Sequence, residues 1–425
     1  MLHQFTFSNF KSFKKTTTLD LIAASITEHA QDLANDCFDE KVLKVSAIFG
    51  ANASGKSNVV KAFDFMRNNV LLSFFRSNDL DQDIETSNLT LDPFKFDNSI
   101  EPSDFEVLFS VDENIYNYGF SIDVDRIREE FLYVRDKKSK KEKFTNIFYR
   151  TGNDVEEVTG ELKSVSNILK ISKILGSRTL FLSFAANLEI PIARTVYEWF
   201  ISSKVMDYGQ DTSERLILNK RASPLVRLLQ DDKQKLALEN FVKAIDLGIE
   251  GFSLIENEIL TPSGADTRYQ VVSTHKNIDD GSLVAVPLHN ESSGTKKMIS
   301  LYIPISRALQ EGSVLFVDEL DAKLHPLLLR YLLILFHSNE SNPKNAQLIF
   351  ATHDVFSLDK SNFRRDEIWF VDKNDQGISD LYSLDSYLLE ENGTTKKVRK
   401  DASYGKDYIL GRYKSVPKLK SLMEE

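Results

Sequence analysis

The fold of this chain is decided by one short stretch, Gly50-Ala51-Asn52-Ala53-Ser54-Gly55-Lys56-Ser57. It fits the pattern G-x-x-x-x-G-K-[ST] of a phosphate-binding loop. The apolar, β-branched residues 42–49 before it predict a buried strand, and residues 58–66 after it carry apolar positions at helical spacing. Strand, glycine-rich loop and helix in this order predict a nucleotide site. A glycine-rich turn without a ligand is the alternative.

The residue types of the loop suit a triphosphate. Gly50 and Gly55 allow backbone conformations that are closed to other residues, so successive N–H groups of the loop can point at phosphate oxygens. Asn52 and Ser54 belong to this predicted cradle. We expect Lys56 to reach the β- and γ-phosphates, and the Ser57 hydroxyl to bind Mg²⁺. ATP and Mg²⁺ are therefore the predicted cofactors.

Length and composition describe an ordinary globular protein. A chain of 425 residues can bury a large core, and its longest apolar runs, such as residues 331–336, are too short to span a bilayer. Cys37 is the one cysteine, which excludes an internal disulfide and any multi-cysteine metal site, and no zinc ligand set stands out. The first residues lack a signal peptide's features, so we expect a cytoplasmic protein that does not bind membranes.

Charge is unevenly distributed along the chain. The formal net charge of −10 argues against a generally basic nucleic-acid binder. Residues 135–143 nevertheless form a basic run, and the stretch from Lys396 onward is also basic. A solvated hairpin tip and a contact with a phosphate backbone both remain open for the run at 135–143.

Hydrophobic periodicity divides the chain into three parts. Residues 1–150 contain the phosphate-binding loop and alternating patterns typical of antiparallel strands, including a hairpin at 105–124. Residues 151–250 carry helical spacing and predict a helical insertion lobe. Residues 251–425 return to strands, with buried strands at 313–317 and 347–352. The predicted fold class is α/β, with a mixed sheet, N-terminal antiparallel β elements and this helical lobe.

Two carboxylates follow the buried strand at 313–317. Asp318 at the strand end is predicted to hold Mg²⁺, directly or through water. Glu319, the next residue, is predicted to polarise the attacking water as the general base. Without the phosphate-binding loop upstream, a strand ending in an acidic turn would be an equal interpretation.

Two further segments have the residues of a nucleotide site. His353 follows the apolar strand at 347–352, and side chains at the carboxyl end of a parallel strand face the ligand crevice. It could contact the γ-phosphate and the attacking water. Ser292, Ser293 and Gly294 precede the apolar helix expected at 298–309, where free N–H groups favour an anion. Ser and Gly are also common at helix starts that bind nothing.

These segments, in this order, resemble the ABC-type ATPase heads of the SMC and RecF kind. The resemblance identifies residues 50–57 as Walker A, residues 292–295 as the signature motif, Asp318 and Glu319 as Walker B, and His353 as the switch histidine. Residues 9–13 and the D-loop-like residues 321–326 support it. It implies a P-loop NTPase fold with ABC-ATPase head architecture. It also implies a homodimer or higher oligomer, in which the signature motif completes the partner's nucleotide site.

A narrower resemblance is to bacterial AAA-type ATPases of abortive-infection systems. It rests on residues 318–326, 367–371 and 408–413, and it covers nearly the whole chain. It implies anti-phage defence together with an effector encoded by a neighbouring gene, often a Toprim-type nuclease. Two departures stand out. Lys414 occupies a position where the family usually has glycine, and Glu129 or Glu130 stands in for the Q-loop glutamine.

The sequence leaves three alternatives. A RecF-like DNA repair or recombination ATPase would bind DNA across the dimer; the basic run at 135–143 and the basic tail would be its evidence, and the acidic net charge speaks against it. A transporter's nucleotide-binding domain is disfavoured by the strand-rich N-terminal part and the long C-terminal extension. A hexameric AAA+ motor is disfavoured by the signature motif at 292–295 and by the absence of an obvious arginine finger.

Overall fold

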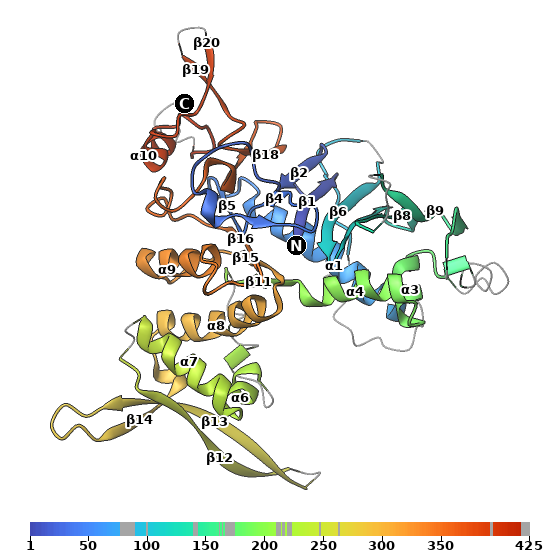
Figure 1. Cartoon of the computed structure of the whole chain (residues 1–425). Helices are drawn as coiled ribbons and strands as arrows, with labels where there is room; N and C mark the ends of the chain where they lie inside the picture. The colour runs from blue at the N-terminus through green and yellow to red at the C-terminus, as the bar shows by residue number, and fades with distance from the viewer. Residues whose placement is uncertain are drawn as a thin grey trace.

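The structure is a computed structural model of the chain, shown in Figure 1. It describes residues 1–76, 90–98, 101–138, 143–160, 162–163, 165, 175–209, 214, 217–218, 223–245, 248–261, 264–391 and 394–417. Residues 77–89, which include the acidic stretch at 79–85, and residues 139–142 at the centre of the basic run lie outside the described residues.

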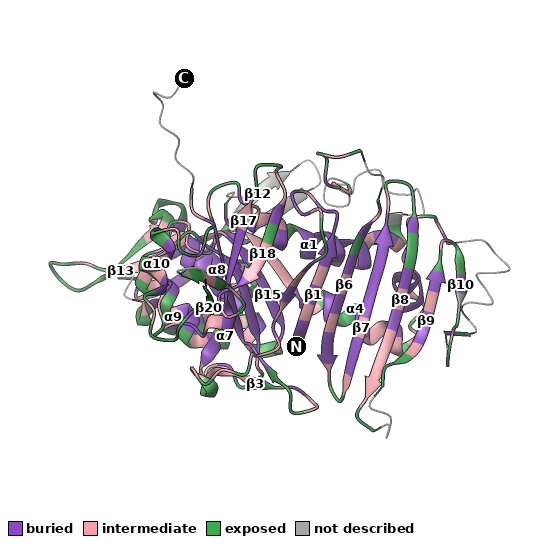
Figure 2. Cartoon of the chain, turned by 90° about the horizontal axis from the view of Figure 1, so that it is seen from above, coloured by how far each residue is buried: buried purple, intermediate pink, exposed green. Residues whose placement is uncertain are grey.

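The N-terminal part forms a seven-stranded antiparallel sheet, in the order β10-β9-β8-β7-β6-β1-β2. Its strands are β1 (Leu2–Ser8), β2 (Thr17–Asp20), β6 (Ser103–Val111), β7 (Asn114–Ile122), β8 (Ile127–Asp136), β9 (Thr145–Thr151) and β10 (Asp154–Glu156). Along β6 buried residues alternate with more exposed ones, because one face of this sheet packs on the core (Figure 2). The predicted N-terminal antiparallel elements and the hairpin at 105–124 are confirmed.

A second, mixed sheet has six strands in the order β11-β15-β16-β5-β17-β18. They are β5 (Val45–Phe49), β11 (Lys204–Asp207), β15 (Val314–Asp318), β16 (Gln347–Ala351), β17 (Ile368–Lys373) and β18 (Ser379–Ser383). Strands β5, β15 and β16 are parallel and buried along their whole length, which explains their continuous apolar sequences. Their carboxyl ends meet at one edge of the sheet, and there they deliver the loops that carry the motifs.

Helix α1 (Lys56–Arg76) connects the two sheets through its aromatic side chains. The Phe63 ring stacks on Phe316 of β15, with 4.1 Å between ring centroids, and meets Phe5 of β1 edge-on at 5.4 Å. Helices α3 (Phe181–Asn187) and α4 (Pro191–Ser202) pack against α1 and close this core. The start of α1 is thereby fixed against both sheets.

The opposite face of the mixed sheet is covered by a second hydrophobic core. Its helices are α6 (Pro224–Leu229), α7 (Asp232–Ala244), α8 (Ser293–Glu311), α9 (Pro326–His337) and α10 (Tyr404–Ile409). Beyond α6 and α7 lies a three-stranded sheet of β12 (Gly251–Thr261), β13 (Gly264–Lys276) and β14 (Leu283–Pro287) (Figure 1). Two small hairpins pair β3 (Ala34–Asn35) with β4 (Lys41–Val42), and β19 (Leu388–Glu391) with β20 (Thr394–Lys397). The predicted α/β class with a mixed sheet is confirmed.

Strand β11 is the main departure from the predicted element pattern. It lies within the segment expected to be helical and pairs in parallel with β15 at the edge of the mixed sheet. Its four half-buried residues, Lys-Val-Met-Asp, show no periodicity that a sequence pattern could detect. The helices before β11 join the first core and the residues after it join the second. Among the described residues, no helix combines the length and apolar character needed to cross a bilayer.

Candidate functional site

The loop at 50–57 leaves β5 and enters α1, as the sequence predicts. Gly50 has no room for a side chain, because a Cβ there would lie 2.6 Å from the Val371 carbonyl oxygen. Gly55 has φ 118°, and a Cβ there would lie 2.6 Å from Ser379 Oγ. Glycine is thus required at position 50 by the close approach of neighbouring atoms and at position 55 also by the backbone conformation. Without side chains at these positions, the backbone of the loop can face a ligand.

Lys56 is held inside the loop that precedes it. Its buried Nζ donates to the carbonyl oxygens of Gly50 at 2.8 Å and Ala51 at 3.0 Å. Burial lowers the pKa of Lys56 to about 8, and the carboxylates of Asp318, Asp321 and Glu319 partly offset the effect. Because the charged amine has lost most of its hydration, a phosphate that replaced the two carbonyl contacts would stabilise its positive charge.

Ser57 and Asp318 come together across the site, although they are far apart in the sequence. Ser57 Oγ donates to Asp318 Oδ1 at 3.0 Å, and only 4% of Asp318 is exposed. Burial raises the pKa of Asp318, because little water is available to solvate its charge. A hydroxyl and a carboxylate in contact are the oxygen donors that Mg²⁺ prefers, so this pair suits the predicted metal.

Glu319 has a strained backbone conformation, and neighbouring side chains contact it. Its φ is 52°, in the left-handed region, and its backbone carbonyl accepts from Lys297 Nζ at 2.9 Å. Its carboxylate packs on Gly209, where a Cβ would come within 2.8 Å of the carboxyl carbon. The Lys297 amine also lies 4.9 Å above the Tyr208 ring. Sequence reasoning missed Lys297, Gly209 and Tyr208, because no local pattern links them to Glu319.

The signature segment begins helix α8. Ser292 is the N-cap residue, and its hydroxyl accepts from the Thr295 N–H at 3.0 Å. Ser292 and Ser293 are exposed, whereas a Cβ on Gly294 would lie 3.1 Å from the Lys323 carbonyl oxygen. The structure therefore places this helix start beside the D-loop-like segment and leaves its two serines facing solvent.

His353 follows β16 at the same edge as the loop. Its backbone N–H donates to both carboxylate oxygens of Asp321, at 3.2 Å each. Burial lowers the pKa of the His353 imidazole, and the positive charge of Lys56 lowers it further. The structure thus brings His353, Asp321 and Lys56 into one electrostatic neighbourhood, which favours the neutral form of the imidazole.

A layer of serines supports the loop from below. Ser379 Oγ donates to the Ser54 carbonyl and lies 2.8 Å from Ser12 Oγ, which also accepts from Asn58 Nδ2 at 2.8 Å. Ser12 comes from the N-terminal turn and Ser379 from β18, so two segments far apart in the sequence meet under the nucleotide loop. The sequence offered no signal for Ser379.

The C-terminal segment also reaches the loop. Ser415 Oγ donates to the Val371 carbonyl and stands 3.1 Å from where a Gly50 Cβ would be. Lys414 and Ser415 have φ 57° and 58°. The left-handed backbone gives a physical reason why glycine is favoured at position 414, and lysine there accepts a modest strain.

The two glutamates considered for the Q-loop lie in the seven-stranded sheet. Glu130 is fully buried, bound to Arg150 at 3.2 Å and accepting the N–H groups of Phe181 and Leu182 at the start of α3. Its carboxylate is occupied by this internal network. Glu130 therefore holds the sheet to α3, and this network gives no support to Glu130 as the stand-in for the Q-loop glutamine. Its neighbour Glu129 is an exposed residue of the same strand.

The residues present fit ATP and Mg²⁺. Within the described part of the chain, Ser54 Oγ is buried without a hydrogen-bond partner, inside the loop that would surround a phosphate. A buried hydroxyl left unsatisfied is costly unless a ligand completes its contacts. Gly50, Asn52, Ser54, Gly55 and Lys56 would hold the phosphates, and Ser57 with Asp318 would hold the metal.

Among the comparisons with known proteins, the family model identifies the class of domain. A family model described as "AAA domain, putative AbiEii toxin, Type IV TA system" matches residues 45–359. The search of curated proteins found no match. Solved structures of the recombination mediator protein RecF, one titled RecF-ATPrS and one RecF-ATP, are 15% and 14% identical. Both alignments cover 90% of this chain, and 98% and 97% of those chains, with TM-scores of 0.35 and 0.32.

TM-scores this low carry no argument about function. The family model, by contrast, spans well over half of the sequence and includes the phosphate-binding loop, Asp318, Glu319 and His353. The chain belongs to this family of AAA domains.

Proposed function

We propose that the protein binds and hydrolyses ATP with Mg²⁺. The observation that carries the proposal is the contact between Ser57 and Asp318, placed beside the buried amine of Lys56 at the carboxyl edge of the parallel sheet. This arrangement places two oxygen ligands for a metal ion and the positive charge of Lys56 beside the same phosphate group. Membership of the AAA family supports it independently.

The residues have separable roles in this proposal. Lys56 stabilises negative charge that develops on the transferred phosphoryl group, and Glu319 accepts the proton of the attacking water. The neutral imidazole of His353 can hydrogen-bond to that water or to the phosphate. Ser57 and Asp318 would hold Mg²⁺, which would supply positive charge against the phosphates.

Dimerisation on ATP extends the proposal. Ser292 and Ser293 are exposed at the start of α8, and although the Ser292 hydroxyl caps the helix, this helix start can meet the nucleotide of a second copy. Glu319→Gln keeps the side chain's shape but cannot accept the proton, so we expect the ATP-bound dimer to accumulate in size-exclusion chromatography with ATP and Mg²⁺. No gain in dimer over wild type would contradict the dimer switch.

Gly294 provides a matched pair of variants for the same point. Gly294→Ala adds only a Cβ, which meets the Lys323 carbonyl at 3.1 Å. Gly294→Asp adds the same atom and a carboxylate facing the γ-phosphate, where like charges cost several kcal/mol. We expect Gly294→Asp to bind ATP but to lose dimerisation and turnover, while Gly294→Ala retains most of both. Wild-type turnover in Gly294→Asp would exclude the signature role.

The biological role that we propose is anti-phage defence through abortive infection, with control of an effector encoded by a neighbouring gene, such as a Toprim-type nuclease. The family description, which names a type IV toxin–antitoxin system, supports the setting. We expect co-expression with the neighbouring gene to confer phage resistance that Lys56→Ala abolishes. Resistance or toxicity from this chain alone would contradict the two-component arrangement.

The alternative partner is DNA, as in a RecF-like repair ATPase. The net charge of −10 disfavours it. ATP-dependent, salt-sensitive binding of duplex DNA by the purified protein, together with no effect of the neighbouring gene on phage resistance, would favour this alternative over the defence role.

A further inference from the structure

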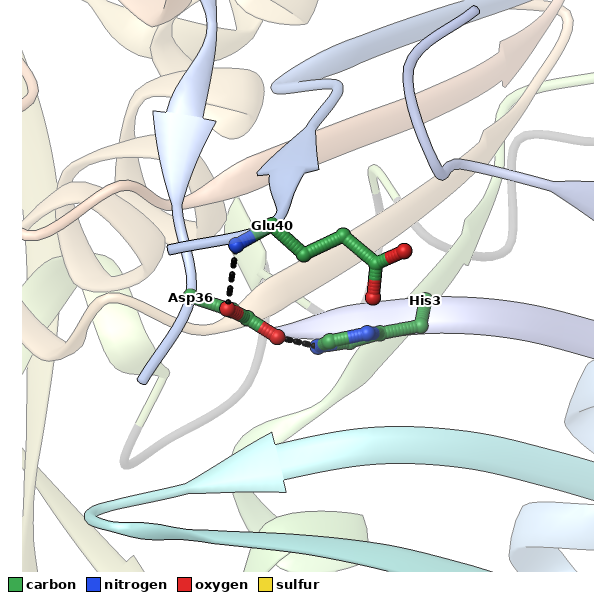
Figure 3. A group of neighbouring side chains, drawn as sticks. All are labelled: His3, Asp36 and Glu40. Atoms are coloured by element: carbon green, nitrogen blue, oxygen red, sulfur yellow. Dashed lines mark hydrogen bonds and ion pairs between the residues drawn. The ribbon is translucent and has the colours of Figure 1, made fainter. Parts of the chain in front are cut away.

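A second cluster of chemistry-bearing side chains lies at the amino-terminal edge of the parallel sheet. Leu2 of β1 is bound there to Gln347, the first residue of β16, with 2.6 Å between the Leu2 N and Gln347 Oε1. The neighbouring His3 faces Asp36 and Glu40 from the turn between β3 and β4 (Figure 3). The nucleotide loop lies at the other end of the same parallel strands, so this cluster is separate from it.

The three side chains offer one donor atom each, and these atoms all lie within 4.8 Å of one another. His3 Nε2 is 3.8 Å from Asp36 Oδ2 and 3.1 Å from Ser110 Oγ. The other oxygen of Asp36 accepts the backbone N–H groups of Phe38 at 2.7 Å and Glu40 at 2.8 Å. These backbone bonds fix the carboxylate so that Oδ2 faces the histidine.

Two buried polar atoms in the cluster have no hydrogen-bond partner. They are His3 Nδ1 and Asp36 Oδ2, on side chains whose residues are 0% and 6% exposed. Such atoms are rare in folded proteins, because each forfeits its hydration without replacement. A cation that takes an electron pair from Asp36 Oδ2 and from one nitrogen of the His3 ring would remove the deficit at Asp36.

We propose that His3, Asp36 and Glu40 bind a divalent first-row transition-metal ion, with Zn²⁺ the best match. Imidazole and carboxylate are suitable ligands for such ions, and two carboxylates balance the charge of the ion. Donors on a tetrahedral zinc stand about 3.4 Å apart, so donor atoms that now lie up to 4.8 Å apart would move closer by at most about 1.4 Å. The exposed side chain of Glu40 can supply most of this movement by a rotamer change.

An ion can reach this cluster from solvent, and its binding would link two segments of the chain. Glu40 is exposed, and Asp36 lines a cavity of about 740 Å³. Once bound, the ion would join β1 to the β3–β4 turn, two segments more than thirty residues apart in the sequence. Because the donors come together only in the folded chain, binding stabilises the folded state by mass action.

The experiment uses the full-length protein, stripped with a chelator and titrated with Co²⁺ as a spectroscopic substitute for Zn²⁺, without nucleotide. We expect a d–d absorption band that saturates at one equivalent, and a Tm that rises by a few degrees with Zn²⁺ and falls back with chelator. Glu40→Gln should weaken Co²⁺ binding at least tenfold without unfolding the protein, because Glu40 is exposed. His3→Gln should abolish binding.

Two control variants make the result specific. Asp39→Asn removes a charge from the same turn but no ligand, so it should bind Co²⁺ as the wild type does. Asp318→Asn disables the predicted Mg²⁺ site and should leave the Co²⁺ band unchanged. No band at one equivalent in the wild type would overturn the proposal. A band of equal affinity in Glu40→Gln, or one lost in Asp318→Asn, would overturn it as well.

Discussion

The two ends of strand β16 are built in different ways. At its carboxyl end, His353 lies close enough to the nucleotide loop for the charge of Lys56 to lower the pKa of its imidazole. The eight residues of that loop are contiguous, and Ser379 supports the loop by a hydrogen bond to the Ser54 carbonyl. At its amino end, Gln347 connects β1 to the segment that precedes β5. Its side-chain oxygen accepts from the Leu2 N–H, and its side-chain nitrogen donates to the carbonyls of Leu2 at 2.8 Å and Leu43 at 2.9 Å. The carboxyl end carries the nucleotide chemistry, and the amino end holds three chain segments together.

The difference follows from what each end must bind. A phosphate group is bound by successive backbone N–H groups, so its site must be a continuous stretch with glycines at fixed positions. The contacts at the amino end are made by side chains, which can come from any segment that the fold brings near. Perturbations at the carboxyl end should therefore affect catalysis, and those at the amino end should affect stability.

The largest effect is expected for Lys56→Ala. The variant removes the cation that faces the phosphates, a loss of about 3–4 kcal/mol in a water-excluded site, so steady-state ATP turnover should fall at least hundredfold. The matched control is Lys233→Ala on the exposed surface of α7. Turnover within threefold of wild type in a folded Lys56→Ala protein would break the assignment of the nucleotide end.

Gln347→Leu should lower the stability of the protein and leave ATP binding nearly unchanged. It leaves the Leu2 N–H and two buried carbonyls without their partners, which should lower the free energy of unfolding by about 2–4 kcal/mol. The Kd for ATP should stay within twofold, as measured by calorimetry on the folded variant. Gln376→Leu, at an exposed turn, is the control for urea denaturation. If Gln347→Leu changed the affinity for ATP and left the stability unchanged, the amino end of β16 would affect nucleotide binding rather than stability, contrary to the proposal.

Lys297→Met tests whether the strained backbone of Glu319 needs its buried support. The amine that donates to the Glu319 carbonyl is removed while the length of the side chain is kept, so turnover should fall about tenfold to thirtyfold. The Kd for ATP should change little. Lys296→Met removes a neighbouring, more exposed amine and should behave as wild type. Equal losses in both variants would show a general effect on helix α8.

The smallest effect is a pH dependence of ATP binding. Burial lowers the pKa of Lys56 to about 8 in the free protein, and ATP binds best to the protonated amine. Affinity should therefore be constant below about pH 7 and should weaken by up to about tenfold as the pH rises to 9. Lys56→Arg keeps its charge throughout this range and should flatten the profile. A wild-type affinity that does not change up to pH 9 would contradict this protonation state.

Sequence patterns identified the parts of the molecule in which local constraints are strongest. The loop at 50–57 could be recognised because backbone geometry demands glycine and the chemistry demands lysine and serine at fixed spacing. The strands β5, β15 and β16 could be recognised because burial on both faces requires continuous apolar runs. The placement of Asp318 at the carboxyl end of β15 followed from the same pattern.

The sequence alone could not show which distant residues support these parts. Ser379 and Ser415 under the loop, and Lys297 beside Glu319, belong to segments whose local patterns suit any surface turn or helix. Strand β11 was missed because its four residues become a strand only by pairing with β15.

The sequence by itself thus determined that this chain forms an α/β domain with a phosphate-binding loop, because backbone conformation and burial are local requirements written into adjacent residues. Only the tertiary structure decided that Ser57 meets Asp318, that Lys297 supports Glu319, and that His3 lies beside Asp36. Each of these contacts joins residues more than twenty positions apart. Their side chains meet because packing of the two cores fixes the strands and helices that carry them.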